Sequence, residues 1–102
     1  MPPYEVVISA DAEQDLLRAA GWYESIVAGL GNRFILQIEK SVDSICSYPL
    51  SFSTYIRYPE VRRKIVFGFP YLIFYNVKGS GIFILAVVHS RKKKKFISKR
   101  LR

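Results

Sequence analysis

The fold depends on one stretch of the sequence, Val61-Arg62-Arg63-Lys64-Ile65-Val66-Phe67-Gly68-Phe69-Pro70-Tyr71-Leu72-Ile73-Phe74-Tyr75-Asn76-Val77. Most of its side chains are β-branched or aromatic, which suits the half-buried surface of a sheet. The stretch is too long for one strand, and Pro70, which has no N–H for a strand ladder, marks the break. Lys78-Gly79-Ser80-Gly81 is a turn sequence, and residues 82–88 form another apolar run of strand length. We therefore predict three consecutive antiparallel strands, a meander.

The first half of the chain predicts a strand and two helices. Residues 4–9 are typical of a short strand, and Ser9 or Asp11 can cap the helix that follows. Apolar residues recur at helical spacing on either side of a break at residues 29–31: Ala12, Leu16, Ala20, Tyr23 and Val27 before it, and Phe34, Ile38, Val42 and Ile45 after it. So short a break predicts an antiparallel helical hairpin, and Pro49 ends its second helix.

The order of these elements predicts one α+β domain over residues 1–102. It contains an N-terminal strand, the helical hairpin packed on one face of an antiparallel sheet, and then the three-stranded meander. We interpret residues 50–60 as a connecting loop that can end in strand. Residues 91–102 form a basic C-terminal tail, which we expect to be mobile and solvated, with a short helix forming on binding.

Charge divides the chain into two parts. Residues 1–60 hold four basic and eight acidic residues, a net charge of −4, whereas residues 61–102 hold twelve basic residues and no acidic one, a net charge of +12. A lysine tail fits the ordinary role of charge in solubility, but forty-two residues without an acid favour a binding face. The partner that such a face predicts is a polyanion, either nucleic acid or an acidic protein segment.

Several classes of protein are disfavoured by composition. No apolar run reaches the ~20 residues of a membrane helix, and Met1 to Glu5 lacks the basic and apolar regions of a secretory leader. A single cysteine, Cys46, forms no internal disulfide, and one cysteine with one histidine makes a poor metal site. We expect a cytoplasmic protein with no cofactor and no metal.

Six residues are candidates for contact with a target: Arg62, Arg63, Lys64, His89, Arg91 and Lys92. Arg62 and Arg63 point to opposite faces of a regular strand, so the sequence does not say which one faces the functional surface. His89 is the single histidine, and it can act as a proton shuttle, bind a target or simply close the end of its strand. The sequence also leaves open whether the cluster at residues 62–64 meets the cluster at residues 89–91.

The chain resembles toxins of the ParE/RelE superfamily, the toxic partners in type II toxin–antitoxin modules. Motifs along the whole chain carry the resemblance: Ala12, Asp15-Leu16, Trp22-Tyr23, Gly29-Leu30-Gly31, Phe34, Ile45, Tyr48-Pro49, Val61-Arg62-Arg63, Phe69-Pro70-Tyr71-Leu72-Ile73-Phe74-Tyr75 and Ala86-Val87-Val88-His89-Ser90-Arg91. RelE-like members cut mRNA on the ribosome, whereas ParE-like members inhibit DNA gyrase and are not known as nucleases. An antitoxin partner is implied in either case, in a hetero-oligomeric complex. We expect its amphipathic helix or acidic extended segment to lie on the helical hairpin or the sheet edge.

The resemblance is closer on the ParE side. RelE-like nucleases typically carry an arginine within the strand motif, where this chain has Leu72, and they tend to have a late tyrosine, whereas none follows Tyr75 here. We therefore expect a non-catalytic gyrase inhibitor. The alternative is a ribosome-dependent mRNA interferase with His89, Arg91 and either Arg63 or Lys64 at its site, which would supply a base and cations for phosphate. A third possibility is an inactive relic that only binds an antitoxin.

Overall fold

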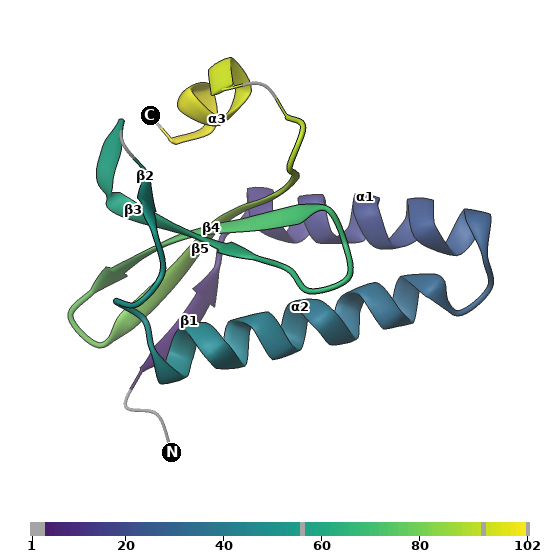
Figure 1. Ribbon diagram of the computed structural model, residues 1–102, viewed down its shortest axis with the longest axis horizontal. Helices are drawn as coiled ribbons and strands as arrows, with labels where there is room; N and C mark the ends of the chain where they lie inside the picture. The colour runs from purple at the N-terminus through teal and green to yellow at the C-terminus, as the bar shows by residue number, and fades with distance from the viewer. Residues whose placement is uncertain (1–3, 56, 93, 102) are drawn as a thin grey trace.

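A computed structural model of the chain describes residues 4–55, 57–92 and 94–101; Lys93 and Arg102 of the predicted basic tail lie outside this part. In chain order its elements are β1 (Glu5–Ile8), α1 (Ala10–Ile26), α2 (Leu30–Ser47), β2 (Thr54–Tyr55), β3 (Tyr58–Ile65), β4 (Tyr71–Lys78), β5 (Gly81–His89) and α3 (Lys94–Leu101). The long helices α1 and α2 cover one face of the sheet, and α3 lies over the other (Figure 1). The predicted α+β class is confirmed.

The sheet contains the predicted meander and one parallel strand. Its order is β1-β5-β4-β3-β2, and the pairs β3–β4 and β4–β5 are antiparallel. The first strand, β1, pairs parallel with β5, with Glu5 opposite Gly81 and Ile8 opposite Ile84. A fully antiparallel sheet was therefore a wrong prediction, because the chain returns from β1 to β5 through a long crossover that contains both helices. The predicted loop over residues 50–60 holds the short strand β2 and the start of β3.

The two long helices form the predicted hairpin, and glycine allows their close approach at one point. Ser9 is the cap of α1, since its hydroxyl accepts the backbone N–H of Ala12 at 3.0 Å. A Cβ added at Gly31 would lie 2.7 Å from the backbone oxygen of Ala20, so a larger residue there would force α1 and α2 apart. At Gly21 on α1, by contrast, an added Cβ would meet nothing within 4 Å.

The main core lies between the helical hairpin and the sheet. Its buried residues come from α1, α2, β4 and β5, and they include Phe34, Ile45, Ile73, Tyr75 and Ile82. Cys46 is buried in the same core. No helix in the described part of the chain is both long and apolar enough to cross a bilayer.

A second, smaller core corrects the prediction of a mobile tail. Helix α3 packs Ile97, which is 4% exposed, against buried residues on the opposite face of the sheet from the hairpin, among them Phe74, Ala86 and Val88. The hydroxyl of Tyr58 on β3 also donates to the backbone oxygen of Ser98 at 3.4 Å. The described tail residues therefore belong to the folded domain, because Phe96, Ile97 and Leu101 give α3 an apolar face.

Tyr75 ties the end of the hairpin to the sheet. Its hydroxyl donates to the backbone oxygen of Pro49 at 2.7 Å, just beyond the end of α2. Burial raises the pKa of Tyr75 to about 12, against a small opposing effect of the Arg62 charge. An ionised phenolate would have to be desolvated and could no longer donate this hydrogen bond, so the fold requires the neutral form.

We expect the stabilising contribution of Tyr75 to fade above pH 10. Its folded pKa of about 12 exceeds the ordinary value of 10.0, so its contribution is complete below pH 10 and is lost as the pH rises through 12. Urea unfolding of wild type and Tyr75→Phe should give a free-energy difference that falls by about 2 kcal/mol between pH 9 and pH 12. The exposed Tyr48 is the matched control, and Tyr48→Phe should change the free energy of unfolding by less than about 0.5 kcal/mol. A Tyr75→Phe difference that is constant with pH would contradict this role.

Candidate binding site at the end of the central strands

Over its second half, one edge of β5 has no neighbouring strand in the described part of the chain, and a side chain of α1 fills that place. Strand β1 ends where Ile8 pairs with Ile84. Farther along β5, the backbone N–H of Val87 donates to Oδ2 of Asp15 at 3.0 Å. In an antiparallel ladder the N–H and C=O of one residue point to the same side, so the carbonyl of Val87 also faces this open edge.

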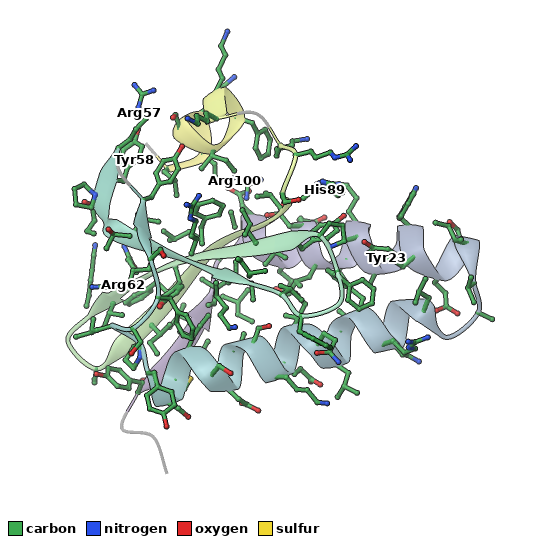
Figure 2. All side chains as sticks on the ribbon, in the orientation of Figure 1. Tyr23, Arg57, Tyr58, Arg62, His89 and Arg100 are labelled. Carbon is green, nitrogen blue, oxygen red and sulfur yellow. The ribbon has the colours of Figure 1, made fainter. Side chains whose placement is uncertain are left out.

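Asp15 joins α1 to α3 around that edge through Arg100. Nη1 of Arg100 donates to Oδ2 of Asp15 at 2.8 Å, and Nη2 donates to Oδ1 at 3.2 Å. The carboxylate is 4% exposed and the guanidinium side chain 17% exposed, so little solvent screens the pair. The hydrogen bonds that Asp15 accepts from the guanidinium raise the pKa of Arg100. Figure 2 shows Arg100 reaching down from α3 toward the sheet and α1.

A cleft of about 420 Å³ opens beside this ion pair. It is lined by side chains from α1, from the ends of β4 and β5, and from the segment leading into α3: Asp15, Arg18, Ala19, Trp22, Tyr71, Val87, Val88, His89, Lys92 and Phe96. Most of the lining is apolar, and Trp22 is 58% exposed at its rim. The charge of Asp15 is offset by Arg100, so the remaining charged groups of the cleft, Arg18 and Lys92, are cations.

His89 lies at the inner end of the cleft. Its ring packs edge-on against Tyr71, with ring centroids 5.4 Å apart, and its Nδ1 accepts the backbone N–H of Arg91 at 3.1 Å. Burial, with a smaller effect of Asp15, raises the pKa of Tyr71, so the aromatic floor of the cleft stays uncharged. Among the described residues, no three His, Cys, Asp or Glu side chains gather as a metal site requires.

The three basic residues of β3 do not join His89. Arg62 pairs with Tyr75 and faces the hairpin, where its guanidinium donates to the backbone oxygens of Leu50 (3.1 Å) and Phe52 (2.8 Å). Arg63 pairs with Phe74 and therefore faces the α3 side, where it is exposed. Arg62 thus holds the segment before β3 in place through its hydrogen bonds. Of the two arginines, Arg63 is the one that faces the α3 side.

Lys64 lies on the hairpin side but at a different hollow. Its Nζ lies 4.9 Å from the ring centre of Phe52, and it lines a hollow along α2 together with Lys40 and Phe67. His89, by contrast, pairs with Tyr71 and shares its cleft with Lys92. The structure therefore brings His89, Arg91 and Lys92 together and leaves all three residues of the 62–64 cluster elsewhere.

Sequence reasoning missed the residues that build the cleft. Asp15, Trp22, Tyr71 and Arg100 did not enter the predicted site, although the pattern of α1 held one clue. Asp15 stands three residues after Ala12 and four before Ala19, on the buried face of the helix. An acid on an apolar helical face needs a partner, but the sequence does not reveal that the partner is Arg100.

Comparison with known proteins places the chain in a family. A family profile described as the ParE toxin of type II toxin-antitoxin system, parDE, matches residues 6–94. The chain belongs to the ParE toxin family. Among solved structures, a chain of the chromosomal ParDE TA system from P. aeruginosa is similar, with a TM-score of 0.72 and 18% sequence identity over 87% of this chain and 98% of that chain. At that identity the likeness shows the fold alone. No curated protein sequence matches significantly.

Membership of the family confirms the resemblance to ParE-like toxins and implies an antitoxin partner. Asp15 and Trp22 lie on α1 within the matched residues, whereas Arg100 lies beyond them. The ion pair that joins α1 to α3 therefore depends on a part of this chain outside the family match.

We expect Asp15→Asn to lower the free energy of unfolding by about 2–3 kcal/mol, because it leaves the half-buried Arg100 without its main counter-charge. The amide oxygen of asparagine can still accept the Val87 N–H, so the loss of stability measures the ion pair between Asp15 and Arg100. Arg18 is the control: it lies 3.6 Å from Asp15 but is 73% exposed, and Arg18→Gln should cost less than about 0.5 kcal/mol. Urea unfolding measures both variants. Equal losses would show that the pair with Arg100 does not anchor α3.

Proposed function

We propose that this ParE-family chain inhibits DNA gyrase by binding, with no catalytic residues of its own. It acts in the cytoplasm, and a cognate antitoxin neutralises it in a hetero-oligomeric complex. The observation that carries the proposal is the environment of Leu72. Leu72 packs with the apolar cluster beneath α3, paired with Ile65 on one side and Val88 on the other. The position at which RelE-like nucleases typically have an arginine is thus built into an apolar layer.

The surroundings of His89 support the same conclusion. Its Nδ1 is engaged by the Arg91 amide, its ring rests on Tyr71, and the acid nearest to it in the cleft, Asp15, is committed to Arg100 and to the Val87 amide. General acid–base cleavage of RNA needs a base, an acid and a cation arranged around one phosphate. His89 has cations near it, but the one carboxylate that lines its cleft, Asp15, is already occupied.

We assign target contact to the exposed cations on the α3 side and at the end of β5. Arg63 is exposed on β3, and Arg91 and Lys92 are exposed just after His89. Arg62 is left out of this surface, because its guanidinium already donates to two backbone oxygens. Exposed arginines suit contacts with carboxylates or phosphates, since their N–H groups form a planar fork.

We assign the antitoxin to the cleft between α1 and the open edge of β5. The cleft offers apolar surface from Trp22 and Phe96 to a large side chain of an added segment. Arg18 and Lys92 at the rim favour acidic residues on either side of such an anchor. This chemistry describes an acidic, extended segment with one large apolar residue.

The second candidate function is a ribosome-dependent mRNA interferase. The observation in its favour is that His89, Arg91 and Lys92 do come together at one cleft. It would have to work without Arg63 and Lys64, which the sequence offered as further members of its site. A chain that binds only an antitoxin is the third candidate, and it predicts no effect on growth.

We expect the double variant Arg63→Glu/Arg91→Glu to lose gyrase inhibition by at least about tenfold in a DNA supercoiling assay. Both side chains are exposed, and each reversal replaces attraction by repulsion at the proposed surface. The same variant should fold normally, with a free energy of unfolding within about 1 kcal/mol of wild type.

The matched control is Arg33→Glu/Lys40→Glu on α2, which changes the net charge equally at exposed positions away from that surface. It should inhibit gyrase like wild type. If the two double variants inhibit gyrase equally well, contact through Arg63 and Arg91 is ruled out.

A further inference from the structure

Six of the eight acidic residues of the chain lie in the layer of the two long helices, across the sheet from a group of basic ones. Helices α1 and α2 carry six acidic residues against three basic ones. On the opposite face, α3 carries four basic residues and no acidic one. Three layers with charge sorted in this way form an electric dipole across the sheet, which orients the molecule toward a polyanion.

The exposed side chains among the described residues of α3 are all lysines. Phe96, Ile97 and Leu101 pack toward the sheet, and Arg100 is held by Asp15, whereas Lys94, Lys95 and Lys99 are exposed. Lys95 and Lys99 are four residues apart, so they lie one helical turn above each other on the same side. Among the described residues of α3, no large apolar side chain is exposed.

These lysines are held on a fixed surface. Helix α3 is anchored at three points: Ile97 in the second core, Arg100 on Asp15, and the backbone of Ser98 on the hydroxyl of Tyr58. A lysine on a mobile tail loses backbone freedom when it binds, whereas a lysine on an anchored helix loses only the freedom of its side chain. The anchoring therefore lowers the entropic cost of binding.

Two arginines extend the same surface over β3. Arg63 is exposed on the α3 side of the sheet. Arg57 precedes Tyr58 and is exposed, and Figure 2 shows it projecting on the side of the sheet that α3 covers. We call the five residues Arg57, Arg63, Lys94, Lys95 and Lys99 the lysine face.

We infer that the lysine face binds the phosphate backbone of duplex DNA without reading its sequence. The inference rests on the proposed function, because gyrase supplies the DNA: a toxin that contacts enzyme and DNA together would bind their complex more tightly than either one alone. When lysines neutralise DNA phosphates, the counterions condensed on the DNA are released, and this release favours binding. Lysines spaced along a helix can provide this contribution to the binding free energy.

The composition of the surface favours DNA over an acidic protein as the partner. The core of a protein–protein interface is apolar and depleted of charged residues, and the outer surface of α3 has the opposite composition. Apolar side chains of the kind that a protein partner would bind line the cleft of His89 and Trp22. The antitoxin and the phosphates are thus assigned to different surfaces, and Arg63 is shared by the lysine face and the surface proposed to contact gyrase.

Fluorescence anisotropy with a labelled 20-bp DNA duplex tests the inference directly on the full chain. The variants are Lys95→Glu/Lys99→Glu on the lysine face and Arg33→Glu/Lys40→Glu on α2, each of which lowers the net charge of +8 by four. We expect the first variant to bind at least about tenfold more weakly at 100 mM salt, with a salt dependence reduced by about 2 in log–log slope. The second should bind within about threefold of wild type. In urea unfolding, both variants should have a free energy of unfolding within about 0.5 kcal/mol of wild type, since all four positions are exposed.

Each of the following results would contradict one part of the proposal. Equal losses in the two variants would show that net charge, and not the lysine face, governs binding. Tighter binding to an RNA duplex of the same sequence would contradict the assignment to DNA. If wild type inhibits gyrase in a supercoiling assay but does not bind the duplex, the inference fails and the proposed function stands. If the lysine face binds DNA but gyrase is not inhibited, the proposed function fails and the DNA-binding surface remains.

Discussion

The hydrogen bonds of Asp15 connect the layers of this molecule. Strand β1 is four residues long, so among the described residues one edge of the second half of β5 has no neighbouring strand, while the other edge pairs with β4. Asp15 replaces that partner by accepting the Val87 N–H, and the same carboxylate holds Arg100 of α3. One buried carboxylate thus fixes α1 against the sheet edge and α3 against the opposite face. The cleft between them and the orientation of the lysine face both depend on this arrangement.

The sequence predicts the elements better than their assembly. The meander, the hairpin and the α+β class follow from local patterns: apolar residues at helical spacing around Phe34 and Ile38, and β-branched or aromatic runs around Ile73 and Ile84. The parallel pairing of β1 with β5 joins residues more than seventy positions apart, and no local pattern encodes it. Helix α3 was predicted to form only on binding, because lysines dominate the composition of the tail, although Ile97 and Leu101 give it an apolar side that packs on the sheet.

The candidate site was predicted only where residues are neighbours in sequence. His89, Arg91 and Lys92 meet because they are adjacent in the chain, whereas their supposed partners on β3 are separated from them by strand alternation and by β4. The two arginines of β3 show the same limit. Arg62 secures the connection before β3 from one face, and Arg63 is exposed on the other. Which arginine serves structure and which can serve binding depends on register, which the sequence did not specify.

Leu72, the position of His89 and the charge sorted across the sheet all favour a toxin that binds over one that cuts. Its family supplies the expectation of an antitoxin, and the cleft beside α1 and the lysine face offer separate surfaces for protein and phosphate. Pulse-labelling of DNA and protein synthesis in the minutes after the gene is induced in a bacterium tests the central claim most directly. Inhibition of gyrase predicts that thymidine incorporation fails first, while amino-acid incorporation continues. Loss of amino-acid incorporation first, with DNA synthesis intact, would contradict the claim and identify a nuclease acting on the ribosome.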